Sequence, residues 1–237
     1  GRSAGSGTSY DYYTAKYAAA DGALLWEKRY NSPANSFDLA QAVAVDGSGN
    51  VVVTGSSNNA SGNLDYYTAK YAATDGALLW EKRYNGPGNS SDEARAVAVD
   101  GGGNVVVTGH SRNASGNYDY YTAKYVAADG VLLWETRYNG PGNSNDYAAD
   151  MVLDGSDNVI VTGSSFGTGT YYDYYTAKYA AADGTLLWEK RYNGLANGDD
   201  DAQAVAVDGS GNVFVTGRSY NGTDYDYVTV RYGATAI

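Results

Sequence analysis

The chain has 237 residues, among them 31 glycines and 25 tyrosines but no cysteine, and its net charge at pH 7 is −11. The absence of cysteine excludes disulfides and thiolate metal sites. Proteins that bind nucleic acid need a basic surface, so the acidic charge argues against a nucleic-acid partner. The sequence also lacks a run of about 18 apolar residues, so we expect no membrane insertion.

A repeated unit of 54 residues organises the whole sequence. Tryptophan recurs at that interval, as Trp26, Trp80, Trp134 and Trp188. The phrase DYYTAKY begins at Asp11, Asp65, Asp119 and Asp173, and it returns as DYVTVRY at Asp226. Near-identical units at a fixed interval predict a stacked or closed repeat architecture, in which a residue present in every unit stabilises that unit.

One unit, taken from residue 43 to residue 84, contains four expected β-strands in chain order. Val43–Val45 and Val51–Thr54 flank the turn-forming sequence DGSGN and predict a β-hairpin. After a polar loop, Tyr66–Tyr71 is rich in tyrosine, and Leu78–Tyr84 alternates between two faces. We name these strands A, B, C and D. No segment shows a sustained helical period.

Short hairpins followed by a longer connection, here residues 85–96, are typical of one blade of a β-propeller. The small side chains of strand A suit the crowded centre, and the aromatic strands C and D suit the wide outer part. We therefore predict an all-β fold, a β-propeller of about four four-stranded blades. A solenoid of β-turns is the alternative, although its units are usually shorter than this repeat.

The same phrases carry a resemblance to a known family. DYYTAKY, DGALLWEKRYNGPGN and AVAVDGSGNVVVTG together resemble the SBBP-type β-propeller repeat of secreted and surface-attached bacterial proteins. The resemblance extends from about Asp11 to Tyr232. It implies a propeller and an extracellular or cell-surface setting, and it implies no reaction.

The expected domain organisation follows the repeat. Residues 1–10 are predicted to be a flexible Gly/Ser-rich segment, and residues 11–237 the propeller domain. The repeat units cover about 11–42 (partial), 43–96, 97–150, 151–204 and 205–237 (partial).

Strand C occurs five times, whereas strands A, B and D occur four times each. We therefore expect the N- and C-terminal strands to share a blade or to be exchanged between copies, because an unpaired edge strand is a template for another chain. Two alternatives stay open: one copy frays, or the chain is part of a larger propeller. The residues expected to take part in strand exchange are Tyr12, Tyr13, Tyr17, Tyr227 and Tyr232.

Two recurring acidic patterns are candidates for a Ca²⁺ site. The DGSGN-like loops, such as Asp46–Asn50, have calcium-type residues but no following bidentate Glu, so we predict hairpin turns there. A second acid precedes strand A in each unit, where it either stabilises the loop or binds a cation with its copies. These weak metal candidates are Asp38, Asp92, Asp146 and Asp200; we expect no other cofactor.

Other recurring residues favour structural roles. The four tryptophans alternate with Leu and Tyr on strand D, which predicts inter-blade core rather than sugar-stacking platforms. Lys70, Glu81 and Arg83 are expected to form cross-strand charge pairs on blade surfaces. His110, the single histidine, replaces serine or arginine of the other units and is expected to be an exposed loop residue.

No triad, histidine-rich metal site or distinctive carboxylate pair occurs, so we predict that the chain is not an enzyme and has no catalytic residues. The expected function is a binding or adhesion scaffold whose B–C and D–A loops contact a protein or carbohydrate ligand. The alternatives are a self-assembling subunit, as an oligomer or filament joined through the surplus terminal strand, and a lectin-like carbohydrate binder.

Overall fold

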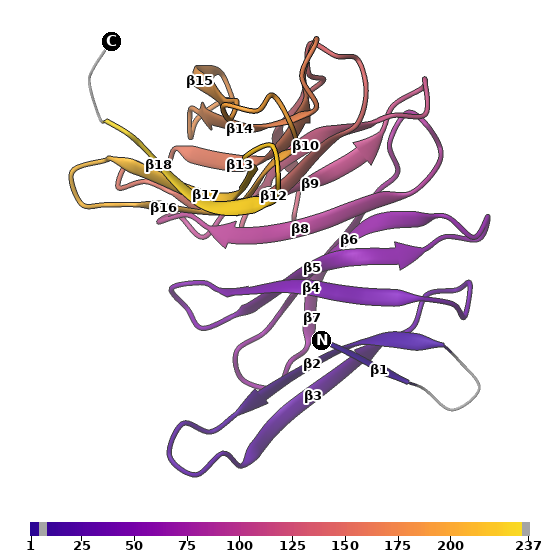
Figure 1. Cartoon of the computed structure of the whole chain (residues 1–237). Coiled ribbons are helices and arrows are strands. Elements are labelled where there is room, and N and C mark those ends of the chain that lie inside the picture. The colour runs from indigo at the N-terminus through magenta and orange to yellow at the C-terminus, as the bar shows by residue number, and fades with distance from the viewer. Residues whose placement is uncertain (5–8, 234–237) are drawn as a thin grey trace. The chain divides into compact units, whose positions relative to one another are not determined.

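The computed structural model describes residues 1–4 and 9–233, and in this part of the chain the regular structure is entirely β. Eighteen strands form five sheets, in which strands adjacent in sequence pair antiparallel (Figure 1). None of the described residues belongs to a helix long and apolar enough to cross a membrane. The prediction of an all-β chain built from strands A to D is confirmed.

The strand bounds repeat from sheet to sheet. The first sheet contains β1 (Arg2–Ala4), β2 (Tyr10–Tyr17) and β3 (Leu24–Tyr30). The second contains β4 (Asp38–Val45), β5 (Val51–Asn58), β6 (Leu64–Tyr71) and β7 (Leu78–Tyr84). The third contains β8 (Asp92–Val99), β9 (Val105–Arg112), β10 (Tyr118–Tyr125) and β11 (Leu132–Tyr138).

The last two sheets continue the pattern. The fourth contains β12 (Asp146–Leu153), β13 (Val159–Phe166), β14 (Tyr172–Tyr179) and β15 (Leu186–Tyr192). The fifth contains β16 (Asp200–Val207), β17 (Val213–Tyr220) and β18 (Tyr225–Tyr232). We call each sheet a blade. Strand A is longer than the predicted Val43–Val45. It begins at the recurring aspartate that precedes these residues, which is Asp38 in the second blade.

The N-terminal strand β1 was not expected. It pairs with β2 in the register that strand B has elsewhere: Arg2 is opposite Tyr12, as Ser56 is opposite Tyr66. The prediction of a flexible segment over residues 1–10 missed it, because three residues are too few to show an alternating pattern; residues 5–8 lie outside the described part. The strands that contain Tyr12–Tyr17 and Tyr227–Tyr232 lie in separate sheets, and their sharing or exchange stays a prediction.

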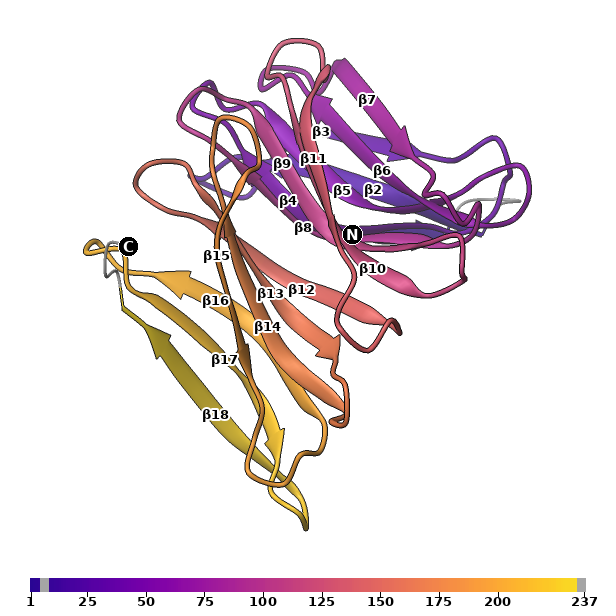
Figure 2. The ribbon, with the colours of Figure 1, turned by 90° about the horizontal axis from the view of Figure 1, so that it is seen from above.

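The chain packs as two compact units. The first comprises Gly1–Val107, Ser111–Gly116 and Tyr125–Leu132; the second comprises Thr108–His110, Asn117–Lys124 and Leu133–Ile237. In the first unit, β8 packs across β4, β5 and β6. In the second unit, β16 packs across β12, β13 and β14 (Figure 2). Within each unit, strand A of one blade therefore covers the face of the blade before it.

Tryptophan joins neighbouring blades within a unit. Trp80 is 6% exposed, and its Nε1 donates a hydrogen bond to the carbonyl of Ala127, in the C–D turn of the next blade, at 3.2 Å. Its ring centroid lies 6.4 Å from that of Tyr125. Trp26 and Trp134 are buried in the same way and donate to Ala73 and Ala181. Such enclosed rings cannot offer a flat face to a sugar.

Trp188 differs from the other three, because it is only partly buried. Its ring lies 6.0 Å from that of Tyr232, and both rings pack against a core cluster that includes Tyr174 and Val215. The structure thus places all four tryptophans on the last strand of a blade and in contact with the next one.

Lys70 is not on the blade surface, so its expected role in a surface charge pair is wrong. The side chain is 3% exposed and points into the junction between two blades. Its Nζ lies 2.9 Å from Oδ2 of Asp46 and donates to the Ala127 carbonyl at 3.0 Å. Lys70 therefore connects the A–B hairpin of its own blade to the C–D turn of the next.

The Asp46 loop is a hairpin turn closed by its own side chain. Oδ1 accepts the backbone N–H groups of Ser48 and Asn50, both at 2.9 Å. Burial acts to raise the pKa of Asp46, but hydrogen bonds from Lys70 and Asn50 prevail and lower this pKa to about 2.

We expect Gly130→Ala to destabilise the chain by about 1–3 kcal/mol. Gly130 has a φ of +67°, and a Cβ there would lie 2.9 Å from the Trp80 ring. Gly22→Ala is the matched control, since Gly22 occupies the equivalent turn with a φ of +72° and a Cβ at that position meets nothing within 4 Å. Urea unfolding of both variants measures the difference. Equal midpoints would show that the tryptophan contact contributes nothing.

The lowered pKa of Asp46 makes stability depend on pH. A carboxyl group whose pKa is lower in the folded state stabilises above its unfolded pKa of about 3.9 and loses that contribution as pH falls towards the folded value. We expect Asp46→Asn to remove this part of the pH dependence between about pH 4 and pH 2. Urea unfolding across this range measures it, with Asp75→Asn in an exposed turn as control. An unchanged slope in Asp46→Asn would contradict the assignment.

Candidate functional site

The B–C loop and the D–A connection of each blade lie at the same end of its sheet. In the second blade Asp38, at the start of strand A, is opposite Ser57, which is in turn opposite Asp65 at the start of strand C. Strand A thus begins where strand B ends and strand C begins. We call this end, with residues 31–37 and 59–63 in this blade, the loop end; the A–B and C–D turns lie at the other end, the hairpin end.

The recurring acids fasten the D–A connections to the loop end. Asp92 is fully buried; Oδ2 accepts the N–H of Gly86 at 2.6 Å and Oδ1 that of Arg112 at 2.9 Å. Asp38, Asp146 and Asp200 are equally buried and accept the N–H groups of Ser32, Gly140 and Gly194. We therefore assign these four acids a loop-stabilising role.

Burial raises the pKa of Asp92, Asp146 and Asp200, and the N–H donors act in the opposite direction. In the described part of the chain, no group of three His, Cys, Asp or Glu side chains lies close enough together to hold a metal ion. The acids weighed as calcium ligands are instead each bonded to backbone N–H groups of their own loops.

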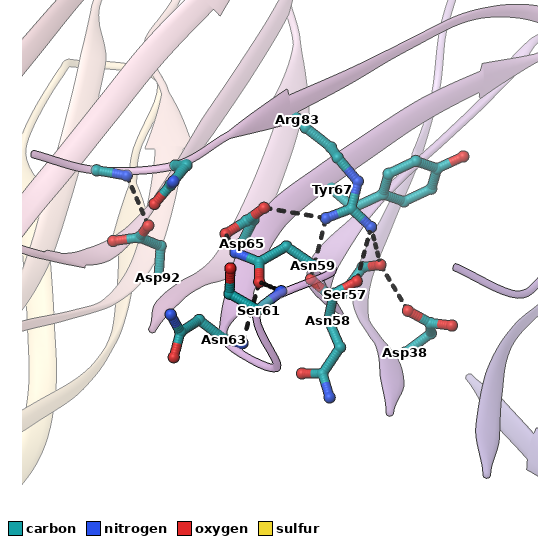
Figure 3. A network of polar contacts seen from close by, with 12 residues as sticks. Asp38, Ser57, Asn58, Asn59, Ser61, Asn63, Asp65, Tyr67, Arg83 and Asp92 are labelled. Carbon is teal, nitrogen blue, oxygen red and sulfur yellow. Dashed lines mark hydrogen bonds and ion pairs between the residues drawn. The ribbon is translucent and has the colours of Figure 1, made fainter. Parts of the chain in front are cut away.

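An arginine on strand D, Arg83, connects strands B, C and D of its own blade (Figure 3) and also contacts the blade before it. Nη1 of Arg83 lies 3.1 Å from Oδ2 of Asp65 and donates to the carbonyl of Ser57 at 3.1 Å. Nη2 donates to the hydroxyl of Ser57, and also to the hydroxyl of Tyr30, on strand D of the blade before, at 3.1 Å. Ser57 in turn donates to Asp38 at 2.5 Å.

This arginine network is repeated along the chain. Arg191 lies 2.9 Å from Asp173 and donates to the hydroxyls of Tyr138 and Ser165. Arg29 lies 3.5 Å from Asp11. Because a guanidinium group has five donors in a fixed plane, one side chain can hold several loop-end strands in register.

The B–C loop itself is held by an asparagine turn. Oδ1 of Asn59 accepts the N–H groups of Ser61 at 2.9 Å and of Asn63 at 3.1 Å, and its Nδ2 donates to Asp65 at 2.8 Å (Figure 3). Such turns hold a polar loop without apolar core. The B–C loop is therefore held in place by hydrogen bonds from its own side chains.

His110 is buried, so the expectation of an exposed loop residue is wrong. It lies on β9, is 4% exposed, and makes edge-on contacts with the rings of Tyr118 and Tyr147, both with centroids at 5.0 Å. Tyr147 also lies 5.9 Å from Tyr172. Sequence reasoning missed this aromatic group because its members come from different strands of two blades.

The position of His110 holds three different residue types in the second to fifth blades. Its equivalents are Ser56, Ser164 and Arg218. Arg218 is exposed, lies over the ring of Tyr225 at 4.5 Å, and pairs with Asp201 at 2.7 Å. Ser56, His110 and Ser164 are buried, so Arg218 is the only one of these four side chains that is exposed.

Large side chains are also exposed at the loop end. Apolar and aromatic residues there would favour contact with another molecule more than with water. The exposed examples on these loops or beside them are Tyr10, Phe37, Tyr171, Leu195 and Tyr225.

Comparison with known proteins defines the class. A crystal structure of BamB from Moraxella catarrhalis matches the chain with a TM-score of 0.51 at 15% sequence identity, covering 82% of this chain and 50% of that one. The fold is a β-propeller architecture of 54-residue repeats, and the chain spans about half the length of that structure.

A family model described as outer membrane protein assembly factor BamB matches residues 68–223, which is more than half of the sequence. The chain belongs to this family. Among curated proteins, no sequence matches it. The narrower resemblance to SBBP-type repeats stays a prediction.

We expect Arg83→Ala to destabilise the chain by about 1–3 kcal/mol, since it leaves Asp65 without its charged partner. Arg95→Ala is the matched control: Arg95 pairs with Glu93, two residues away on the same strand, where a surface ion pair contributes about 0–1 kcal/mol. Urea unfolding compares them. A loss in Arg83→Ala no greater than in Arg95→Ala would contradict the bridging role.

Proposed function

We propose that the chain is a non-catalytic binding scaffold whose partner is a protein that contacts the loop end. The proposal rests on one contrast at the loop end. The hydrogen bonds and ion pairs that hold the loops recur from blade to blade, whereas the exposed side chains on the loops differ. The Asp92-type and Arg83-type contacts recur between blades, whereas exposed loop positions differ: Phe37 corresponds to Ser91, Asn145 and Asp199, and Leu195 corresponds to Pro33, Pro87 and Pro141. A rigid scaffold that presents different side chains from one surface is suited to recognition.

The family supports a protein as the partner. Its description names an outer membrane protein assembly factor, which is a protein that acts with other proteins. The resemblance to SBBP-type repeats supports an extracellular or cell-surface setting, in which an adhesion role is one form of such binding. The charge of −11 favours a partner with a basic contact surface.

Site-specific photo-crosslinking tests the proposal. A photoreactive phenylalanine derivative replaces Tyr171 or Tyr225 at the loop end, and Ser48 or Ser210 at the hairpin end, in separate variants expressed in the source cell. We expect crosslinks to another protein from the loop-end positions and none from the hairpin-end positions. Crosslinks confined to the hairpin end, or none at any position, would overturn the proposal.

Self-assembly is the second candidate, and an edge strand favours it. β18 is the last strand of a three-stranded sheet, and Tyr227 on it is 79% exposed. A long exposed edge can pair with a strand of another copy. Light scattering over a concentration series tests this: growth in mass that is lost on deletion of residues 1–17 supports strand exchange, and a constant monomer mass contradicts it.

A further inference from the structure

The first blade has an open edge where the other blades have strand B. In this blade β1 pairs with residues 10–12 of β2, and backbone hydrogen bonds to Gly1 extend the pairing to Tyr13. In the second blade, strand B continues further, and its residues 51–54 also pair with strand C. Among the described residues, none pairs with the corresponding edge of β2, residues 14–17. We call this edge the open edge.

Backbone groups of β2 point out of the open edge. Tyr13 accepts a hydrogen bond from the nitrogen of Gly1 at 3.1 Å and donates one to its carbonyl at 3.0 Å, so both backbone groups of Tyr13 face this side. The direction of these groups alternates along an antiparallel strand, so those of Ala15 and Tyr17 face the same side. An edge with unpaired N–H and C=O groups is a template for a strand of another chain.

Apolar side chains of the second blade lie uncovered beside the open edge. Val43 and Val45 on β4 are 63% and 60% exposed, and a cavity of about 160 Å³ lies between β4 and β2, with Val43 in its wall. In the fifth blade, Val205, the equivalent of Val43, packs against a cluster that contains Ile160 of strand B in the fourth blade. The first blade lacks the residue that corresponds to Ile160, and an added strand would supply it.

The repeats define which side chains fit. In the second and fourth blades, Val52 and Ile160 lie opposite the lysine of strand C, and both are 0% exposed. Two residues after Val52, the hydroxyl of Thr54 lies 2.8 Å from that of the threonine opposite it. The corresponding lysine and threonine of the first blade are Lys16 and Thr14. The open edge therefore fits a strand with an apolar residue opposite Lys16 and a threonine opposite Thr14.

The other face of such a strand has no comparable requirement. Val53 of the second blade is buried in a cluster with Tyr12 and Trp26 of the first blade. None of the described residues forms a blade before the first, so an added side chain at the position of Val53 would lie in water. Side-chain packing therefore selects only one face of the strand.

Lys16 adds a preference for an acidic group. In the second blade the equivalent Lys70 pairs with Asp46, in the A–B hairpin, at 2.9 Å. Lys16 donates to the carbonyl of Ala73 at 2.7 Å, but no described carboxylate pairs with it. A carboxylate that precedes the added strand at the spacing of Asp46 would complete this ion pair.

We propose that the open edge binds an extended segment of another protein, which adds to β2 as an antiparallel strand. The segment has an acidic residue, then a β-branched apolar residue opposite Lys16 and a threonine opposite Thr14. Strand B of the second to fifth blades already pairs on both of its edges, so a folded second copy has no such strand to offer. The site differs from the loop-end surface, because it presents a backbone edge rather than loop side chains.

Two-dimensional ¹H–¹⁵N NMR of the full chain tests the proposal with the synthetic peptide DGSGNVVVT, which has the sequence of residues 46–54. We expect saturable shifts at residues 13–17 and 42–45, because the peptide pairs with β2 and covers β4. Shifts at residues 225–232 alone would place the peptide on the edge of β18 and would overturn the proposal.

Two variants of the peptide test the selection, and neither affects the folding of the chain. The peptide with Val52→Ser should bind at least about tenfold more weakly, because it loses the apolar contact with Val43 and Val45. The peptide with Val53→Ser is the matched control. It should keep its affinity within about twofold, since this side chain lies in water.

Three further results would overturn the proposal. The first is no saturable shift with the unmodified peptide, and the second is equal affinity of the two serine variants. The third is a chain that light scattering shows to be a dimer and that the peptide converts to a monomer, because a second copy would then occupy the open edge.

Discussion

The carbonyl of Ala127 is the contact on which the stacking of blades depends. It accepts hydrogen bonds from Nε1 of Trp80 and Nζ of Lys70, both of which belong to the preceding blade. A carbonyl with two donors uses both of its lone pairs, and it gives each of these two buried side chains a hydrogen-bond partner at the blade junction. The same arrangement, with Lys124 and Trp134 donating to Ala181, recurs in the second unit.

This contact explains why the two ends of a blade can serve different purposes. At the hairpin end, Lys70 and Trp80 bind the next blade, and Lys124 and Trp134 repeat this contact. At the loop end, Asp92 and Arg83 hold the backbone, and exposed loop positions such as that of Phe37 differ between blades. The recurring residues thus maintain the structure, and the variable loop residues are the ones that we propose for recognition.

The strands could be predicted from the sequence because alternation and turn residues are local signals. The loop-stabilising role of the recurring acids could also be predicted, because the hydrogen-bond partners of Asp92 are only six and twenty residues away in the sequence. The burial of Lys70 was not, because its carbonyl partner is 57 residues further along the chain. His110 escaped prediction for the same reason: alternation assigns a side chain to a face but does not say what covers that face.

The exchange rate of the indole N–H protons, measured by NMR, tests the central contact most directly. If Trp26, Trp80 and Trp134 donate to the carbonyls of the next blade, their indole protons should exchange as slowly as the central amides of strand B, because both require opening of the blade junction. Exchange as fast as that of an exposed indole would contradict the account, since the blades would then not be joined through these residues.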